Sequence, residues 1–158
     1  MKNTFKRSGA ALISLVLLLV LAVSAGAASS QNVGVKFWKE RSDKESMANS
    51  GIDPDRTATL TRQANGTYTL TLPVTQVSKL GVTGYLSGLT IGDVTYDGTL
   101  PGDFNKATAV LTIKNLPASV LTGSDSNQAL AVTCSIKMDT VLLGDITTSA
   151  RMSVWVER

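Results

Sequence analysis

The sequence has no histidine and only one cysteine, Cys134, among its 158 residues. The absence of histidine excludes histidine general acid–base catalysis, Ser-His-Asp triads, histidine zinc sites and histidine haem ligation. A single cysteine permits no disulfide within the chain, so a folded domain has to be held together by packing. No nucleophile–base pair is visible in the sequence, and we therefore expect a protein that is not an enzyme.

Long hydrophobic runs are also missing, except at the N terminus. Residues 1–27 contain a basic start, MKNTFKRSG, then the mostly apolar run AALISLVLLLVLAV and the small residues SAGA. This order is typical of a secretory signal peptide, and the run is shorter than the roughly 20 residues of a membrane span. We predict that cleavage leaves residues 28–158 as one domain with no membrane span, either secreted or associated with the cell surface.

An excess of charge of one sign is lacking once the signal segment is set aside. The whole chain carries a formal net charge of +3, from 15 basic and 12 acidic residues. Three of the basic residues and none of the acidic ones lie in residues 1–27, so residues 28–158 carry 12 of each. A domain without net positive charge offers no basic surface for nucleic acid or for an anionic membrane, and we expect neither as a partner.

Residues 28–158 consist of short segments in which apolar and polar residues alternate, a pattern typical of half-buried β-strands. Asn65-Gly66 separates two of these segments and predicts a tight hairpin, because both residues accept the positive φ that such turns require. The lack of a helical repeat, with frequent turns, indicates an all-β fold, an immunoglobulin-like antiparallel β-sandwich. The predicted strands are 32–38, 56–63, 67–74, two within 79–98, 106–116, 128–138 and 149–157.

The same alternation assigns side chains to the two faces of the sheet. Cys134 falls on the apolar face of its strand, which favours a buried structural cysteine over a reactive thiol. In the last predicted strand, Met152 and Val154 share the apolar face and Trp155 points to the opposite face. We therefore expect a tryptophan outside the core, where a buried one would be the commoner finding.

Two apolar features have no obvious place in the core. Met47 lies in the polar stretch KERSDKESMANSGIDPD, and the tip of the hairpin before the last predicted strand carries Val141, Leu142 and Leu143. Apolar residues at a hairpin tip either fold back over the end of the sandwich or form an exposed patch. Exposed apolar patches often mark binding sites, so both features are candidate binding surfaces.

Three stretches resemble the NEAT (near-iron-transporter) family, which comprises haem-binding domains of secreted and surface proteins of Gram-positive bacteria. They are VGVKFWKERSDKESMANSGIDPDRTATLTRQANGTYTLTLPV, LGVTGYLSGLTI and SIKMDTVLLGDITTSARMSVWVE, and the resemblance spans residues 33–157. The chain is most similar to divergent members of clostridial type. The resemblance implies an immunoglobulin-like sandwich with one short 3₁₀ helix, and haem held between that helix and the hairpin of the last two strands.

Carried over by position, the resemblance places the 3₁₀ helix at residues 45–50 and the hairpin at residues 136–152. Ser46 and Met47 then occupy the lip of the haem site. The tyrosine ligand that haem-binding members have near the start of the last strand is missing, because that region reads LLGDITTSARM. The ligands implied for a bound iron are therefore the thioethers of Met47 and Met138. A third methionine, Met152, also lies near this region, but alternation turns it to the core face.

Two functions follow from the resemblance. The first is haem binding by a secreted domain, in iron acquisition or haem transfer, with haem or a haem-carrying protein as the partner. The second is a NEAT-like adhesion or protein-interaction module that has lost haem and binds other cell-surface proteins. The implied haem slot consists of Ser46, Met47, Met138, Val141, Leu142 and Leu143.

Overall fold

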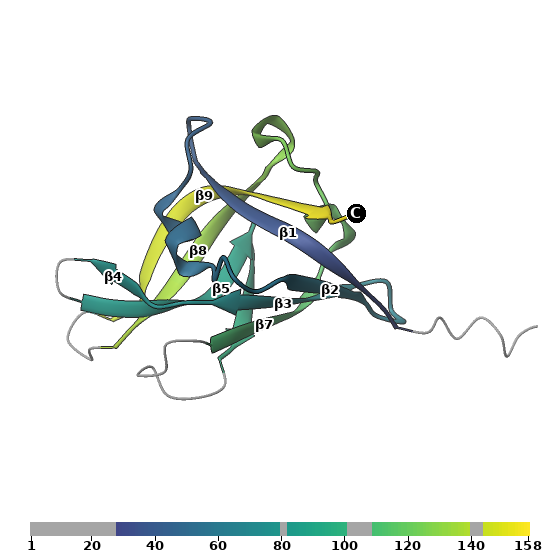
Figure 1. Ribbon diagram of the computed structural model, residues 1–158, viewed down its shortest axis with the longest axis horizontal. Coiled ribbons are helices and arrows are strands. Elements are labelled where there is room, and N and C mark those ends of the chain that lie inside the picture. Colours follow the sequence, from purple (N-terminus) through teal and green to yellow (C-terminus); the bar gives the residue numbers. More distant parts are fainter. Residues whose placement is uncertain (1–27, 80–81, 101–108, 140–143) are drawn as a thin grey trace, which may run out of the picture.

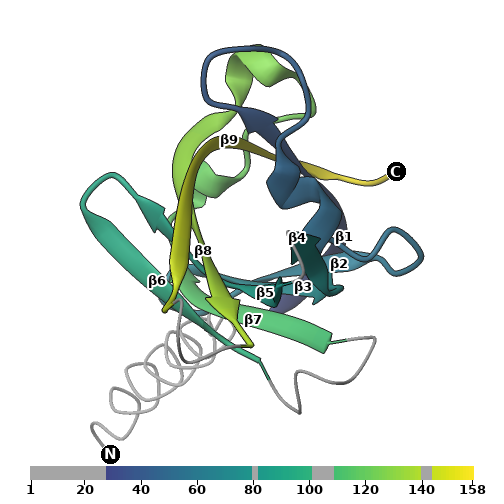
Figure 2. The ribbon, with the colours of Figure 1, turned by 90° about the vertical axis from the view of Figure 1, so that its left-hand side faces the viewer.

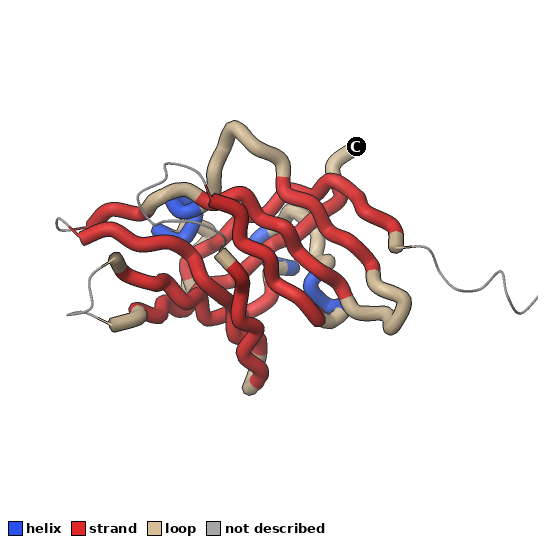
Figure 3. The backbone as a smooth tube through the Cα atoms, turned by 90° about the horizontal axis from the view of Figure 1, so that it is seen from below, coloured by secondary structure: helices blue, strands red, loops and turns tan. Residues whose placement is uncertain are grey.

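The computed structural model describes residues 28–79, 82–100, 109–139 and 144–158, and strands make up most of this part of the chain (Figure 3). The strands are β1 (Ser29–Lys39), β2 (Ala58–Arg62), β3 (Tyr68–Val74), β4 (Val77–Lys79), β5 (Val82–Ile91), β6 (Val94–Thr99), β7 (Ala109–Leu116), β8 (Leu130–Met138) and β9 (Ile146–Val156). The 3₁₀ helices are η2 (Met47–Gly51), η3 (Ala118–Val120) and η4 (Ser126–Gln128). Each predicted strand is present with shifted ends, and the short β4 is an addition.

The strands pair antiparallel in one sheet that closes on itself. Their order is β4-β5-β6-β7-β3-β2-β1-β9-β8, and β8 pairs back onto β5. The short β4 stands outside the ring, and among the described strands it pairs with the start of β5 alone. Figures 1 and 2 show the strands from the side and from one end, wrapped around a common interior.

The all-β prediction is confirmed, whereas the sheet is continuous rather than divided into two packed sheets. The reason lies in β5, which pairs with β6 along one edge and with β8 along the other. A register shift between Leu86 and Gly88 marks a bulge in its pairing with β8. Bulges bend a strand and increase its twist, which lets the sheet curve until its two ends meet.

The predicted hairpin at Asn65-Gly66 connects β2 to β3. Only Gly66 has the positive φ expected of both turn residues: its φ is +83°, in the left-handed region that glycine enters without a steric penalty, whereas the φ of Asn65 is not positive. The Asn65 side-chain oxygen accepts hydrogen bonds from the Thr67 N–H at 3.0 Å and from the Thr67 hydroxyl at 2.7 Å. These local bonds hold the turn, and the two strands leave it with Arg62 opposite Tyr68.

The interior of the ring contains mostly aliphatic side chains, together with Phe37, Tyr85 and Cys134. Cys134 is fully buried, and burial raises the pKa of its thiol to about 12. The prediction of a structural cysteine is therefore confirmed. Trp155 is only partly buried and lies over Gly34, where a Cβ atom would collide with the indole. The predicted outward direction of Trp155 is confirmed, and the bare backbone of Gly34 makes room for it.

Candidate functional site

The polar stretch after β1 contains the 3₁₀ helix η2, and Ser46 is its N-cap. The Ser46 hydroxyl accepts a hydrogen bond from the Ala48 N–H at 3.3 Å, the interaction by which polar residues cap a helix. The Ser46 N–H donates to the Phe37 carbonyl at 2.9 Å. The short helix expected at residues 45–50 is thus present one to two residues further along, and Ser46 holds it in place.

Asn49 fixes η2 to β1 by imitating the backbone of a neighbouring strand. Its side-chain oxygen accepts from the Phe37 N–H at 2.7 Å, and its side-chain NH₂ donates to the Phe37 carbonyl at 3.0 Å. Both backbone groups of a strand residue are normally satisfied by the next strand. Here one amide side chain replaces that strand, and it holds η2 beside Phe37, near the C-terminal end of β1.

The two ends of η2 face different surroundings. Ala48 is buried, and Gly51 packs so closely on β4 and β5 that a Cβ atom would lie 3.0 Å from Val77 and 3.1 Å from Leu86. Met47 is 56% exposed and is the most exposed of the large apolar side chains in the described residues. Packing of Ala48 and Gly51 therefore fixes the helix, and the thioether of Met47 points outward.

Met47 lines an apolar cleft of about 240 Å³ between η2 and the hairpin of β8 and β9. Its lining residues are Met47 and Ala48 from η2, Val77 from β4, Ile136 and Met138 from β8, and Ile146, Thr147 and Thr148 from β9. Six of these eight are apolar, and two of the six are methionines. A cleft with this lining is suited to an apolar ligand, and it places two thioether sulfurs on one surface.

The structure brings together part of the predicted slot. Met47 and Met138 both line the cleft. Ser46 does not line it and acts as the helix cap, while Val141, Leu142 and Leu143 lie outside the described residues. Six lining residues were not part of the predicted slot: Ala48, Val77, Ile136, Ile146, Thr147 and Thr148. All except Val77 lie within the predicted helix, 45–50, or the predicted hairpin, 136–152. Alternation in the final strand could have indicated Ile146, but that strand begins three residues earlier than predicted.

Charged side chains beside η2 are paired with one another. Lys36 forms an ion pair with Glu45 at 2.6 Å, and its ammonium lies 4.5 Å from the centre of the Trp38 ring. The hydrogen bond from Lys36, followed by its charge, lowers the pKa of the Glu45 carboxyl. The Trp38 indole N–H donates to the Ser153 hydroxyl at 2.9 Å. Through Glu45, this cluster ties the middle of the polar stretch to the outer face of β1 and β9, and none of its members lines the cleft.

The donors in the cleft limit the metals it could hold. The described lining contains two thioethers and no tyrosine, since the chain's tyrosines are at positions 68, 85 and 96. In the described part of the chain, no three cysteine or carboxylate side chains come together as a metal site. Thioethers are soft ligands that accept haem iron or copper(I) and are poor ligands for hard cations.

Scans against protein-family models and against curated protein sequences return no match. Two solved structures match over 84% of this chain and 99% of their own: the NEAT5 domain of IsdX2, a B. anthracis hemophore, in complex with haem, and a point mutant of that domain, also with haem. Sequence identity is 11% for each, and the TM-scores are 0.53 and 0.55. The chain has a NEAT-like fold.

The NEAT-like fold agrees with the resemblance found in the sequence. At 11% identity the likeness concerns the path of the chain and not its ligand. No helix in the described residues is long and apolar enough to cross a membrane. The predicted signal peptide, residues 1–27, lies outside the described residues.

Proposed function

We propose that residues 28–158 form an exported, non-catalytic NEAT-like domain that binds haem in the cleft between η2 and the hairpin of β8 and β9. The observation that carries the proposal is the apolar cleft itself, lined by Met47 and Met138, in a fold whose solved neighbours hold haem. Export rests on the signal-peptide pattern of residues 1–27. The domain would serve iron acquisition or haem transfer, with a haem-carrying protein as its partner.

The residues of the cleft fit the chemistry of a porphyrin. Haem presents a flat apolar surface, and each Å² of apolar surface removed from water contributes about 25 cal/mol. The lining supplies that contact through Ala48, Val77, Ile136 and Ile146. The described cleft, at about 240 Å³, is small, so these residues would enclose only part of a haem. Bound haem would supply an iron atom, and the thioethers of Met47 and Met138 are the side chains that would hold it.

A hemin titration of the purified mature chain tests the proposal. We expect a saturable shift of the Soret band at one haem per chain. Met47→Leu and Met138→Leu keep the apolar volume but remove the sulfur, so they separate ligation from burial. A change of the band in either variant supports thioether ligation. Val94→Ala, which removes an exposed apolar side chain of β6 outside the cleft lining, serves as the control.

A second function is favoured by the missing tyrosine. A domain of this fold that lacks a phenolate ligand in its cleft could use the same apolar surface for a partner protein. In that case hemin produces no saturable Soret shift, and the cleft residues instead contact a cell-surface protein. An absent shift would refute haem binding. A shift that is the same in the wild-type chain and in both leucine variants would refute ligation by methionine and leave haem binding standing.

A further inference from the structure

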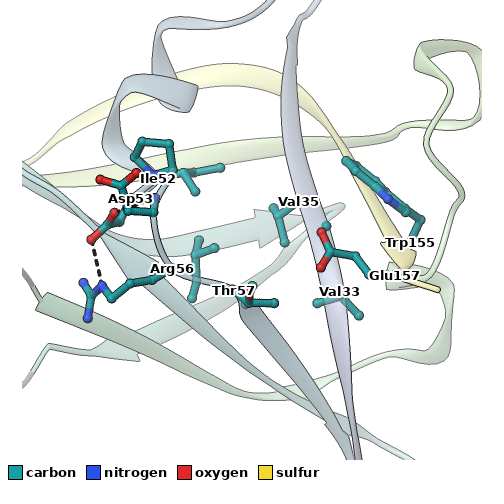
Figure 4. Close-up of a pocket in the computed structure, with 13 residues that line it drawn as sticks. Val33, Val35, Ile52, Asp53, Arg56, Thr57, Trp155 and Glu157 are labelled. Carbon is teal, nitrogen blue, oxygen red and sulfur yellow. Dashed lines mark hydrogen bonds and ion pairs between the residues drawn. The ribbon is translucent and has the colours of Figure 1, made fainter.

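A second groove, of about 270 Å³, crosses β1 on the other side of η2 and shares no lining residue with the methionine cleft. Figure 4 shows Ile52, Asp53 and Arg56 on one side of β1 and Trp155 on the other, with Glu157 beside the strand. The groove takes no part in the proposed haem binding.

The floor of the groove is a break in the hydrogen-bonded ladder of β1. Pairing of β1 with β2 ends at Val33, opposite Ala58. Two pairs further along, Phe37 bonds to the side chain of Asn49. Between these points no strand of the described residues lies opposite Val35 on that edge. Along this edge β2 covers Val33 and Asn49 covers Phe37, and Val35 between them faces a gap the width of one residue pair.

The backbone N–H and C=O of Val35 point into this gap. On the β9 side, the Asn32 carbonyl accepts from the Glu157 N–H at 3.1 Å. Backbone groups of successive strand residues alternate between the two edges, so the groups of Val33, Val35 and Phe37 face away from β9. Val154, which lies opposite Val35 in β9, shows the same alternation: its N–H and C=O bond to Thr122, away from β1.

The charges around the groove are not balanced. Arg56 is occupied, because it pairs with Asp53 at 2.7 Å and donates to the Ala109 carbonyl at 2.8 Å. Asp55 and Glu157 also line the groove, and within the described residues neither carboxylate takes part in an ion pair. The groove therefore carries two carboxylates without an ion pair in the described residues, and the partly exposed indole of Trp155 lines the same groove.

We propose that this groove binds an extended, basic peptide segment of a partner protein. The segment pairs its backbone with the open N–H and C=O of Val35, as a short β-strand addition. Its arginine or lysine side chain lies against Trp155 and near Glu157 and Asp55. Cations are attracted to the face of an indole as well as to carboxylates, whereas an acidic segment would be repelled by the two unpaired charges.

The test uses the ¹⁵N-labelled mature chain and capped pentapeptides of sequence Thr-Val-Arg-Val-Thr. We expect saturable shifts of the Val35 amide and the Trp155 indole N–H, with a dissociation constant on the order of 1 mM, and weaker binding at high salt. The peptide with glutamate in place of arginine should bind at least about fivefold more weakly, because it loses two exposed ion pairs and is repelled by the same carboxylates. An arginine peptide with N-methylated backbone amides should lose binding.

Matched variants separate the local charges from the net charge. Asp55→Asn with Glu157→Gln should weaken binding of the arginine peptide about fivefold, an effect again set by two exposed ion pairs. Asp93→Asn with Asp97→Asn removes the same charge outside the groove lining and should leave binding unchanged. The proposal is overturned if the arginine peptide causes no shift at Val35, if the glutamate or N-methylated peptide binds equally well, or if both double variants behave alike.

Discussion

Replacing Asn49 by alanine tests how η2 is attached to the rest of the domain. The change removes the 2.7 Å acceptor of the Phe37 N–H and the 3.0 Å donor to the Phe37 carbonyl. The carbonyl keeps its bond from the Ser46 N–H, whereas the described residues supply no second acceptor for the amide. A buried donor left without a partner costs about 1–3 kcal/mol, so we expect Asn49→Ala to lower the free energy of unfolding by about 2 kcal/mol.

Urea unfolding followed by tryptophan fluorescence measures the effect. The midpoint should fall with no change in slope, because the surface exposed on unfolding stays the same. Ser50→Ala is the control, since it removes only an exposed bond to the Met47 carbonyl, and it should cost less than about 0.5 kcal/mol. A loss for Asn49→Ala no greater than that for Ser50→Ala would refute the idea that one side chain replaces a strand.

Three further predictions concern the ring and its surface. Gly34→Ala should displace the Trp155 indole, lower stability by about 1–3 kcal/mol and shift tryptophan emission; unaltered emission would contradict the observed contact. Cys134 should resist thiol reagents at pH 8 until the chain unfolds, because burial raises its pKa to about 12; rapid labelling of the folded chain would contradict its burial. Arg56, with the Asp55 N–H, holds the pKa of Asp53 below its ordinary value of 3.8. The ionised Asp53 therefore stabilises the fold above about pH 4, and this stabilisation is lost as the pH falls through the pKa of Asp53 in the folded chain. In Arg56→Gln, the melting temperature should therefore fall less steeply as the pH is lowered.

The strands were predictable because alternation records which side chains face the interior. Leu70, Leu72 and Val74 of β3 are buried as their spacing indicates, and Trp155 faces outward for the same reason. The turn at Asn65-Gly66 was predictable from the chemistry of two residues. Such features depend on neighbours in the sequence, and no long-range contact is needed to specify them.

Closure of the sheet was not predictable from the same pattern. Alternation gives the face of a residue but not the strand beside it, and β5 meets β8 across nearly fifty residues of chain. The bulge at Leu86 and Gly88 that accompanies this pairing has no distinct signature beyond a glycine. A continuous ring and two facing sheets therefore produce the same sequence periodicity.

The residues of the cleft were likewise predictable only in part. Met47 drew attention because an apolar residue was out of place in a polar stretch, and the resemblance supplied Met138. Val77 could not be assigned, because β4 is only three residues long and its side chain reaches the cleft through its place next to β5. The groove over β1 was equally hidden, because a gap in a ladder depends on where neighbouring strands diverge.

The seam between β1 and β9 has a consequence for how the chain folds. β1, the first strand of the described residues, pairs with β9, the last of them, from Val33 opposite Val156 to Lys39 opposite Ala150. Folds dominated by such distant pairings form slowly, in milliseconds to seconds, because the loop has to close before its contacts are gained. During synthesis, β1 therefore lacks its β9 partner until residues 150–156 have been made, and the ring should close only after β9 has left the ribosome.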